Sequence, residues 1–449
     1  MSYFILFLQV SVCKTNLTGL YGKRSLDMLL KHSVQTKINI IDSIMGSGKT
    51  SWAIQYINES PTGTKFIFIT PYLTEIKRII EYTTKPFVQP EQNGRRNKLD
   101  SLKQAIANGE NIVSTHALFK RCDSELIQLI EAENYVLILD EVLDTIDEIN
   151  MTRDDIKILL NSTDDKGTPI VSIGTKGEVK WNNSEYDSGN YQTIRNLANA
   201  GNLILFDESK MYWLFPTDLF KAFSEVFILT YMFEGQIQCY YYCLFNMRFT
   251  YQSVGYDAKL GYYLTEYKEK KGEDRQRFKS LINIYYSSPS DNRDINKVGE
   301  KHNAFSKSHL NINLKNKYYK DMIKKNSYNF YRHKINCSTK HVIWTTFKDN
   351  KKILTPIGLS KRFVPINARA TNEYAAANTC IYLANRYMNP MIKRFFHSHD
   401  IKVNEDLFAL SELLQWLFRS AIRNNEPIDV YIPSERMRTL LEMYLNNKI

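Results

Sequence analysis

A glycine-rich turn that ends in Lys-Thr is the stretch of the sequence with the clearest chemistry. It follows the β-branched run 38–41 and precedes an apolar helical pattern from Trp52 to Ile57, so we expect it to join a buried strand to a helix. In that context successive backbone N–H groups and the positive end of the helix face one centre and favour a phosphate. Lys49 is expected to reach the β- and γ-phosphates of ATP, and the Thr50 hydroxyl to hold Mg²⁺. The predicted nucleotide-binding residues are Met45, Gly46, Ser47, Gly48, Lys49, Thr50 and Ser51.

Two adjacent carboxylates, Asp140 and Glu141, end a second apolar run at 135–139. Because ligands bind beyond the carboxyl ends of the strands in open α/β sheets, this pair is predicted to face the same site as the turn. Asp140 would hold Mg²⁺ together with Thr50, and Glu141 would orient and deprotonate the attacking water. Such a pair can also merely cap a helix. The phosphate-binding pattern itself departs from the usual Gly or Ala at Ser43, so an ordinary strand–helix turn is the alternative.

Polar residues follow other predicted strands. Thr70 ends the apolar run 65–69, and Thr115 and His116 end the run 111–114. If these strands are parallel neighbours, all three side chains lie at the edge that carries the acidic pair. In the second half, Thr346 ends the strand predicted at 341–345.

The strongest helical pattern lies near the carboxyl terminus, at 407–422. Gln415, Arg419 and Arg423 are spaced by four residues and would form one stripe on this helix. The two arginines are either surface residues or reach the γ-phosphate, where a guanidinium stabilises charge in the transition state.

Composition sets the broad class of the protein. With 449 residues, 43% hydrophobic and 24% charged, the chain is long enough for two or three globular domains. The formal charge of +11 favours a polyanionic partner. Six scattered cysteines indicate a reducing compartment. The apolar opening 1–10 is too short to cross a bilayer and lacks signal-peptide features, so we expect a soluble cytoplasmic protein without a membrane partner.

The predicted domain organisation is a lead-in at 1–35, a first α/β domain at 36–235 and a second at 236–449. An irregular insertion is expected at about 151–215 and a basic helical insertion at about 293–340. In the second domain we predict strands at 282–286 and 428–434 and a helix at 375–387.

The order of these motifs resembles that of superfamily 2 DEAD-like helicases, and most closely the compact ones of bacteriophages and prophages. Residues 45–50 resemble motif I, 68–71 motif Ia and 140–143 the DExx box, here Asp-Glu-Val-Leu. Similar but looser matches cover the remaining motifs: 114–119 for the DNA-contacting motif, 229–231 for motif III, 344–347 for motif IV, 368–373 for motif V and 415–423 for motif VI. Motif VI lacks its usual glycine, so Arg419 and Arg423 both stay candidates for the arginine finger.

The resemblance implies an α/β fold with two RecA-like domains, each a parallel sheet flanked by helices. It implies an ATP- and Mg²⁺-dependent DNA helicase or translocase of phage replication or recombination, located in the cytoplasm of the host cell and working with other replication proteins. The implied catalytic residues are Lys49, Asp140, Glu141, Gln415, Arg419 and Arg423. The implied nucleic-acid contacts are Thr70, Thr115, His116, Thr346, Arg369 and Thr371, to single-stranded or forked DNA, with RNA as the other nucleic-acid partner.

Two other functions use the same ATP site. The first is the motor of a restriction or DNA-packaging system, but an attached nuclease would need metal-binding carboxylates at strand ends. The runs 282–286 and 342–347 carry none. The second is a protein that does not translocate and uses ATP only to switch its affinity for DNA.

Overall fold

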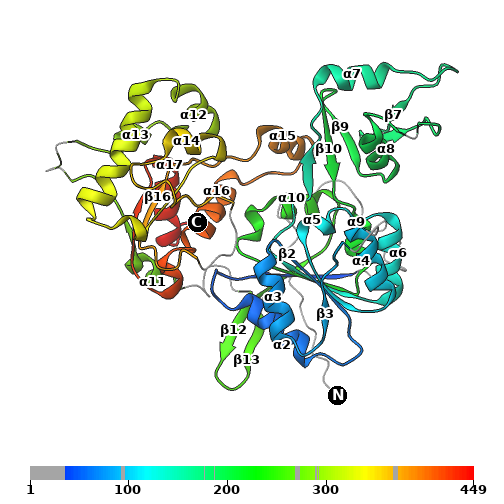
Figure 1. Cartoon of the computed structure of the whole chain (residues 1–449), viewed down its shortest axis with the longest axis horizontal. Coiled ribbons are helices and arrows are strands. Elements are labelled where there is room, and N and C mark those ends of the chain that lie inside the picture. Colours follow the sequence, from blue (N-terminus) through cyan, green and yellow to red (C-terminus); the bar gives the residue numbers. More distant parts are fainter. Residues whose placement is uncertain are drawn as a thin grey trace, which may run out of the picture. The chain divides into compact units, whose positions relative to one another are not determined.

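The computed structural model describes residues 36–92, 97–175, 177–186, 188–267, 274–288, 291, 293–367 and 373–449 (Figure 1). The predictions for the lead-in 1–35, for Arg369 and for Thr371 lie outside these residues. The chain forms two compact units. The first contains residues up to 42, 49–265 and 395–402, and the second contains 43–48, 266–394 and 403–449.

A mostly parallel eight-stranded sheet forms the centre of the first unit (Figure 1). Its strand order is β13-β12-β1-β11-β5-β2-β4-β3. The strands are β1 (Lys37–Asp42), β2 (Phe66–Thr70), β3 (Phe87–Val88), β4 (Asn111–Thr115), β5 (Val136–Asp140), β11 (Glu225–Thr230), β12 (Thr250–Asp257) and β13 (Gly261–Glu266). The central strands are apolar on both faces because helices cover both sides of the sheet.

Alternate residues of each central strand enter two different cores. On β5, Leu137 and Leu139 pack in one core and Val136 and Ile138 in the other. The first core is closed by α4 (Lys98–Ala107), α5 (His116–Phe119), α6 (Ser124–Glu133), α9 (Thr217–Lys221) and α10 (Ile237–Leu244). The second is closed by α2 (Lys49–Glu59) and α3 (Leu73–Tyr82). The predicted strand–helix units of residues 38–140 are therefore present.

An insertion with its own small core lies between β5 and β11. It contains the sheet β6-β10-β9 and the hairpin β7-β8. Its elements are β6 (Ile146–Glu148), α7 (Arg153–Asn161), β7 (Val171–Ile173), β8 (Val179–Trp181), α8 (Gln192–Asn199), β9 (Leu203–Phe206) and β10 (Lys210–Leu214). The insertion predicted at 151–215 corresponds to this segment.

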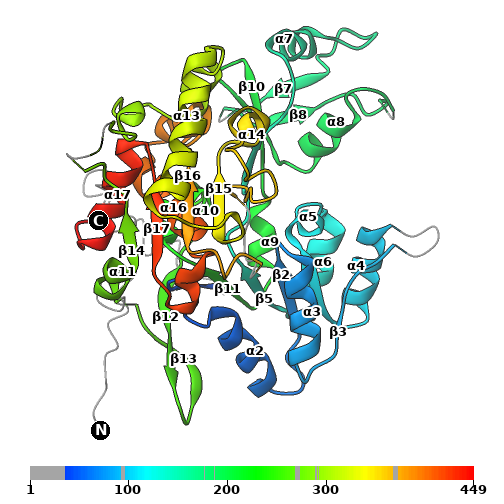
Figure 2. The same ribbon diagram turned by 60° about the vertical axis from the view of Figure 1, so that its left-hand side comes forward.

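The second unit is built on a four-stranded parallel sheet of order β14-β17-β16-β15 (Figure 2). Its strands are β14 (Ile282–Ile284), β15 (Val342–Thr345), β16 (Thr379–Tyr382) and β17 (Ile428–Tyr431). On β16, Ile381 packs in the core beneath the basic insertion, whereas the ring of Tyr382 contacts that of Trp416. The helices of this unit are α11 (Arg275–Leu281), α12 (Lys307–Asn313), α13 (Lys317–Asn329), α14 (Lys351–Leu354), α16 (Glu405–Leu417) and α17 (Glu435–Leu445). Helix α15 (Pro390–Ser398) begins in the second unit, and its residues from Phe395 onward belong to the first.

The helix predicted at 375–387 is wrong, because β16 occupies the middle of this range. All four residues of β16 are buried. The strand lies between β17 and β15, and side chains pack against it on both faces of the sheet. A short apolar run of this kind has no alternation, and periodicity cannot distinguish it from a buried helix.

The first unit also extends further than the boundary predicted at 235. β12 pairs in parallel with β1 at Asn39↔Thr250, so the chain as far as Thr265 belongs to the first unit. The residues just after 235, where the second domain was predicted to begin, form helix α10 of the first unit instead.

Asp42, the last residue of β1, fixes the end of the neighbouring strand. Its carboxylate accepts hydrogen bonds from the backbone N–H groups of Met232 (2.9 Å) and Phe233 (2.8 Å), just after β11. Asp42 is 4% exposed, so water cannot take the place of its carboxylate as the acceptor for these two N–H groups. Met232 adopts a left-handed backbone (φ 55°), which this contact helps to hold.

We expect Asp42→Asn to lower the free energy of unfolding by about 1–3 kcal/mol, because an amide accepts less well and its NH₂ group faces a backbone donor. Asp257→Asn is a matched control, since Asp257 accepts from Lys259 N and Leu260 N in an exposed turn. Urea unfolding of both variants measures the difference. Equal losses for the two would contradict the role of Asp42.

Candidate ATP-binding and hydrolysis site

The turn between β1 and α2 has the backbone that a phosphate-binding loop requires. Gly46 (φ 82°) and Gly48 (φ 91°) both lie in the left-handed region, which side chains disfavour. Ser47 N donates to Ile44 O at 3.2 Å and tightens the turn. α2 begins at Lys49 and has no acidic residue in its first turn, so nothing there competes with an anion.

The register of the sheet places polar residues in one row at the carboxyl ends of the strands. Asp42 is paired with Thr230, Leu229 with Asp140, and Thr70 with Thr115. β11 lies between the strand that enters the turn and the strand that carries the acidic pair. The hydroxyl of Thr230 is fully buried and has no hydrogen-bond partner among the described residues.

Asp140 is the centre of the hydrogen bonds at this edge. Thr50 on α2 donates to its Oδ1 at 3.4 Å, and Thr70 on β2 donates to its Oδ2 at 3.2 Å. His116 Nε2 lies 3.2 Å from the Asp140 carbonyl oxygen. The predicted Mg²⁺-binding pair, Thr50 and Asp140, is thus brought together from positions 90 residues apart.

Glu141 turns away from the line of β5. Its φ of 74° is left-handed, a conformation that costs a non-glycine residue about 1 kcal/mol or more. The strain is offset by a hydrogen bond from Glu141 N to Leu229 O at 2.9 Å. Its Oε2 atom is buried without a hydrogen-bond partner among the described residues. A strained backbone together with a buried carboxylate oxygen that has no partner is expected of a residue that binds or activates a ligand.

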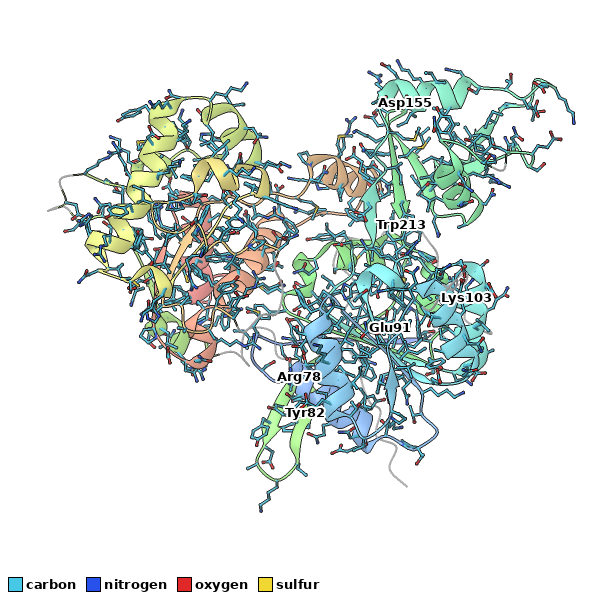
Figure 3. The ribbon with its side chains drawn as sticks, in the orientation of Figure 1. Arg78, Tyr82, Glu91, Lys103, Asp155 and Trp213 are labelled. Carbon is cyan, nitrogen blue, oxygen red and sulfur yellow. The ribbon has the colours of Figure 1, made fainter. Side chains whose placement is uncertain are left out.

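Burial, together with the nearby carboxylates of Glu141 and Glu75, raises the pKa of Asp140 to about 7. Thr70 and Lys49 oppose this change. Glu75 was missed by the sequence analysis; it lies in the first turn of α3. Arg78 on the same helix pairs with Glu75 (3.3 Å) and donates to Ser51 Oγ (3.0 Å), joining α3 to α2 (Figure 3).

The chemistry of these side chains fits Mg²⁺. The charges of Glu141 and Glu75 repel that of Asp140, and this repulsion favours a divalent cation beside Asp140. Within the described residues, no group of three or more His, Cys, Asp or Glu residues is arranged to hold a metal ion alone. The ion would therefore be held by Asp140 and Thr50 together with phosphate oxygens and water, which is how Mg²⁺ is usually bound.

The residues that resemblance assigns to nucleic acid are not all at the surface. Thr70 is fully buried and its hydroxyl donates a hydrogen bond to Asp140. It therefore positions that carboxylate and is not placed to contact a nucleic-acid strand. Thr346 is 1% exposed. Thr115 is partly exposed at the end of β4, and His116, also partly exposed, begins α5.

The predicted stripe of Gln415, Arg419 and Arg423 on one helix is wrong. α16 ends at Leu417, Arg419 lies in the following turn and Arg423 in a short 3₁₀ helix at Ala421–Asn424. Arg419 is 3% exposed and donates to Pro365 O at 3.3 Å, whereas Arg423 is exposed. The apolar pattern continues past the helix because the turn is buried too.

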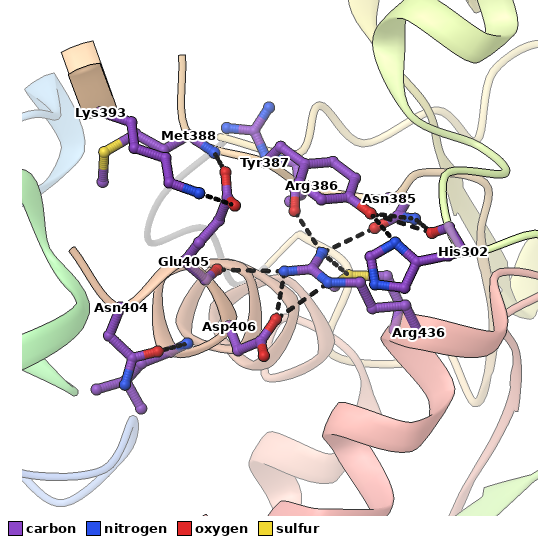
Figure 4. A network of polar contacts seen from close by, with 12 residues as sticks. His302, Asn385, Arg386, Tyr387, Met388, Lys393, Asn404, Glu405, Asp406 and Arg436 are labelled. Carbon is purple, nitrogen blue, oxygen red and sulfur yellow. Dashed lines mark hydrogen bonds and ion pairs between the residues drawn. The ribbon is translucent and has the colours of Figure 1, made fainter. Parts of the chain in front are cut away.

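Arg436, which the sequence analysis missed, joins three elements of the second unit (Figure 4). From the first turn of α17 it donates to Asp406 on α16 (2.6 Å) and to Arg386 O after β16 (2.7 Å). Its guanidinium lies 4.3 Å from the ring centre of Tyr387. These contacts hold the carboxyl end of β16 against both helices. No local signal identifies this residue, since its partners come together only in the fold.

Known proteins resemble both units. Family models match residues 276–445 (YonV C-terminal Rossmann-like domain) and 146–213 (YonV middle domain). Over 420 residues, 92% of this chain and 99% of the relative, the chain is 39% identical to the SPbeta prophage-derived uncharacterized protein YonV of Bacillus subtilis (strain 168). The chain belongs to the YonV family. The middle-domain match coincides with the insertion between β5 and β11.

Solved XPD structures share part of the arrangement of this YonV family member. A structure described as XPD apo has a TM-score of 0.46 at 13% identity, covering 91% of this chain and 95% of that chain. One described as XPD helicase has 0.45 at 11%, covering 92% and 95%, and S. tokodaii Xpd4 has 0.46 at 10%, covering 92% and 94%. At this level of overlap neither the activity nor the residues of those proteins transfer to this chain. Within its described part, no helix is long and apolar enough to cross a membrane.

We expect Asp140→Asn to stabilise the protein without Mg²⁺ and nucleotide at pH 8. Folding raises the pKa of Asp140 from 3.8 to about 7, so the stability linked to its proton is complete below about pH 4 and is lost as the pH rises through 7. The asparagine avoids this loss, and its free energy of unfolding should exceed that of the wild type by about 1–3 kcal/mol at pH 8 and by less at pH 5.

Urea unfolding in EDTA at the two pH values measures this difference. Asp147→Asn, which removes an exposed carboxylate of the same unit, is the control. An Asp140→Asn protein that is less stable than the wild type at pH 8 would show that the carboxylate is not penalised by burial.

Proposed function

We propose that this YonV family member is an ATP-driven nucleic-acid helicase or translocase that hydrolyses ATP at the edge formed by the β1–α2 turn, β5 and β11. The contact between Thr50 Oγ1 and Asp140 Oδ1 is the observation that carries the proposal. It joins the start of the helix after a phosphate-type turn to a strand that ends in two carboxylates. That combination serves phosphoryl transfer, and an ordinary strand–helix turn has no need of it.

Each residue has a defined part in the reaction. The N–H groups of the turn and Lys49 bind the β- and γ-phosphates, and Lys49 neutralises charge that builds up on them. Glu141 accepts a proton from the water that attacks the γ-phosphorus, while the bond to the β–γ bridging oxygen breaks. Mg²⁺, when bound, withdraws charge from the phosphate oxygens. Thr70 holds the Asp140 carboxylate in the orientation that ion binding requires.

DNA is the proposed polymer on which this ATPase acts. The chain carries a formal charge of +11, and its relative is prophage-derived. The order of the motifs resembles that of DEAD-like helicases, so we place the protein in phage DNA replication or recombination. A motor must move along any sequence, and contacts to the phosphate backbone supply this without reading bases.

Lys49→Ala and Glu141→Gln are each expected to lower kcat for DNA-stimulated ATP hydrolysis by about 100-fold or more. Lys49→Ala should also weaken ATP binding, because a phosphate contact is lost, whereas Glu141→Gln should bind ATP normally since the ground state does not need a base. Steady-state ATPase assays and binding of a fluorescent ATP analogue measure both effects. Lys77→Ala and Glu81→Gln, exposed changes of the same types on α3, are the controls. Turnover that survives either site change would refute the assignment.

Strand displacement separates a motor from an ATP-dependent switch. A motor should release the labelled strand of a tailed duplex only with hydrolysable ATP, and Glu141→Gln should abolish this release. ATPase activity that DNA stimulates without any displacement or movement along a single strand would support the switch instead.

We propose Arg423 as the arginine that acts on the nucleotide, because its side chain is exposed and makes no hydrogen bond to a described residue. Arg423→Ala should lower kcat by about 100-fold or more with no change in unfolding midpoint. Arg419→Ala should instead lower the free energy of unfolding by about 1–2 kcal/mol, since Pro365 O loses a buried donor. Activity assays and thermal unfolding of both variants distinguish the roles, and a fully active Arg423→Ala would remove Arg423 from the site.

A further inference from the structure

The positive charge of the chain is concentrated in one segment of the second unit. Residues 293–362 contain 17 of the 59 lysines and arginines but only 4 of the 48 aspartates and glutamates. The remaining residues carry 42 basic and 44 acidic side chains, so the net charge of +11 arises entirely from this segment. A single-sign concentration of this kind produces a local field that the rest of the surface does not share.

Helix α13 displays part of this charge on its solvent side. Its buried side carries Ile323, Asn326 and Ser327, and Asn326 Nδ2 donates to Ile295 O at 3.1 Å. With 100° per residue, the opposite side carries Lys317, Tyr318, Asp321 and Lys325, with Lys324 at its border. We call the basic and aromatic side chains of this surface the lysine face; they are Lys317, Tyr318, Lys324 and Lys325 on α13, with Lys315 just before the helix.

The lysine face is not neutralised by its surroundings. None of its four lysines forms an ion pair or a side-chain hydrogen bond with a described residue. Asp321, the one acidic residue of α13, lies on the same side, four residues from both Lys317 and Lys325, but forms no ion pair with a described residue. In segment 293–362 the ion pairs among described residues are those of Lys307 with Asp349 and of Lys334 with Asp291. Elsewhere, lysines such as Lys103 and Lys120 each contact two carboxylates.

An unpaired cluster of like charges lowers stability by mutual repulsion. Solubility alone does not require it, because surfaces with interspersed signs are equally soluble. The packing of α13 does not require it either, since that rests on the opposite side of the helix. A polyanion that binds this face removes the repulsion and releases its own counterions.

We propose that the lysine face binds the phosphate backbone of single-stranded nucleic acid. The inference rests on the proposed function and adds a binding surface that none of the helicase-type motifs contains. Single strands are favoured over duplexes by Tyr318, which is 74% exposed beside Lys317. An exposed ring next to cations offers a stacking platform for an unpaired base, while the lysines follow the backbone.

The test compares two triple variants that remove the same charge. Lys317→Gln/Lys324→Gln/Lys325→Gln changes the lysine face, and Lys157→Gln/Lys180→Gln/Lys259→Gln changes exposed lysines of the first unit. Binding of fluorescein-labelled oligo(dT) is measured by anisotropy without nucleotide from 50 to 300 mM NaCl. We expect the first variant to raise Kd by about 10-fold or more at 100 mM and to reduce the slope of log K against log salt by about 2, and the control to change Kd by less than about twofold.

Tyr318 gives a readout that charge alone does not produce. Tyr318→Ala should weaken oligo(dT) binding by about fivefold or more and leave duplex binding unchanged, whereas Tyr318→Phe keeps the ring and should bind normally. Equal loss in both tyrosine variants would overturn the stacking role. Poly-glutamate that displaces oligo(dT) at equal charge concentration would overturn nucleic acid as the ligand and favour an acidic protein.

The outcomes separate this inference from the proposed function. If the wild type binds DNA and DNA stimulates its ATPase, but the lysine-face variant binds like the control, the surface is misassigned and the motor stands. If the wild type binds no nucleic acid and its ATPase is not stimulated, both fail. All variants must keep the unfolding midpoint of the wild type, which is expected because the substituted side chains are largely on the solvent side of α13.

Discussion

The candidate site depends on one carboxylate that is buried close to two others. Asp140 is more than nine-tenths inaccessible, with Glu141 adjacent and Glu75 near enough to raise its pKa. The Thr70 hydroxyl and Lys49 offset only part of this penalty, since the pKa still rises to about 7. The fold therefore maintains a local excess of negative charge that a divalent cation would relieve. An arrangement that lowers stability in the empty protein is one that ligand binding can use.

The parallel sheet makes this arrangement possible. The parallel strands β1, β11, β5, β2 and β4 all end at the same edge of the sheet. The pairings Asp42↔Thr230 and Thr70↔Thr115 put polar side chains in one row there. Insertion of β11 between β1 and β5 separates the turn from the acidic pair by one strand. The Thr50 hydroxyl still reaches Asp140, because α2 starts immediately after the turn. Basic, acidic and hydroxyl side chains thus come together from α2, α3, β2 and β5. No long loop has to fold around the site to bring them there.

Sequence reasoning succeeded where a residue's role follows from its neighbours in the chain. The turn at 45–50, the strand before it and the acidic pair after β5 all have local signatures, and the structure contains each element. It failed where burial on all sides removes periodicity, as at β16, and where an apolar pattern continues through a buried turn, as at Arg419. It missed the effect of Glu75 on Asp140, the contact of Arg78 with Ser51 and the contacts of Arg436, because each of these joins two different elements. Thr70 shows an intermediate case, since its place at the edge was predicted but its hydrogen bond to Asp140 depends on which strand lies beside β2.

Charge is distributed along the chain in a way that suits the two anions that we propose as ligands. The proposed nucleotide site uses few cationic side chains: backbone N–H groups, a helix end and Lys49 would suffice for a triphosphate, and Mg²⁺ would balance the carboxylates there. A long polyanion requires many cationic side chains, because its charge is spread over many phosphates and each contact is weak and screened by salt. The excess of lysine in segment 293–362, on a helix whose packing does not need it, meets that requirement. The absence of these lysines from the strand ends also suits the proposed site, since unpaired lysines beside Asp140 would neutralise the carboxylate that we propose as a ligand of Mg²⁺.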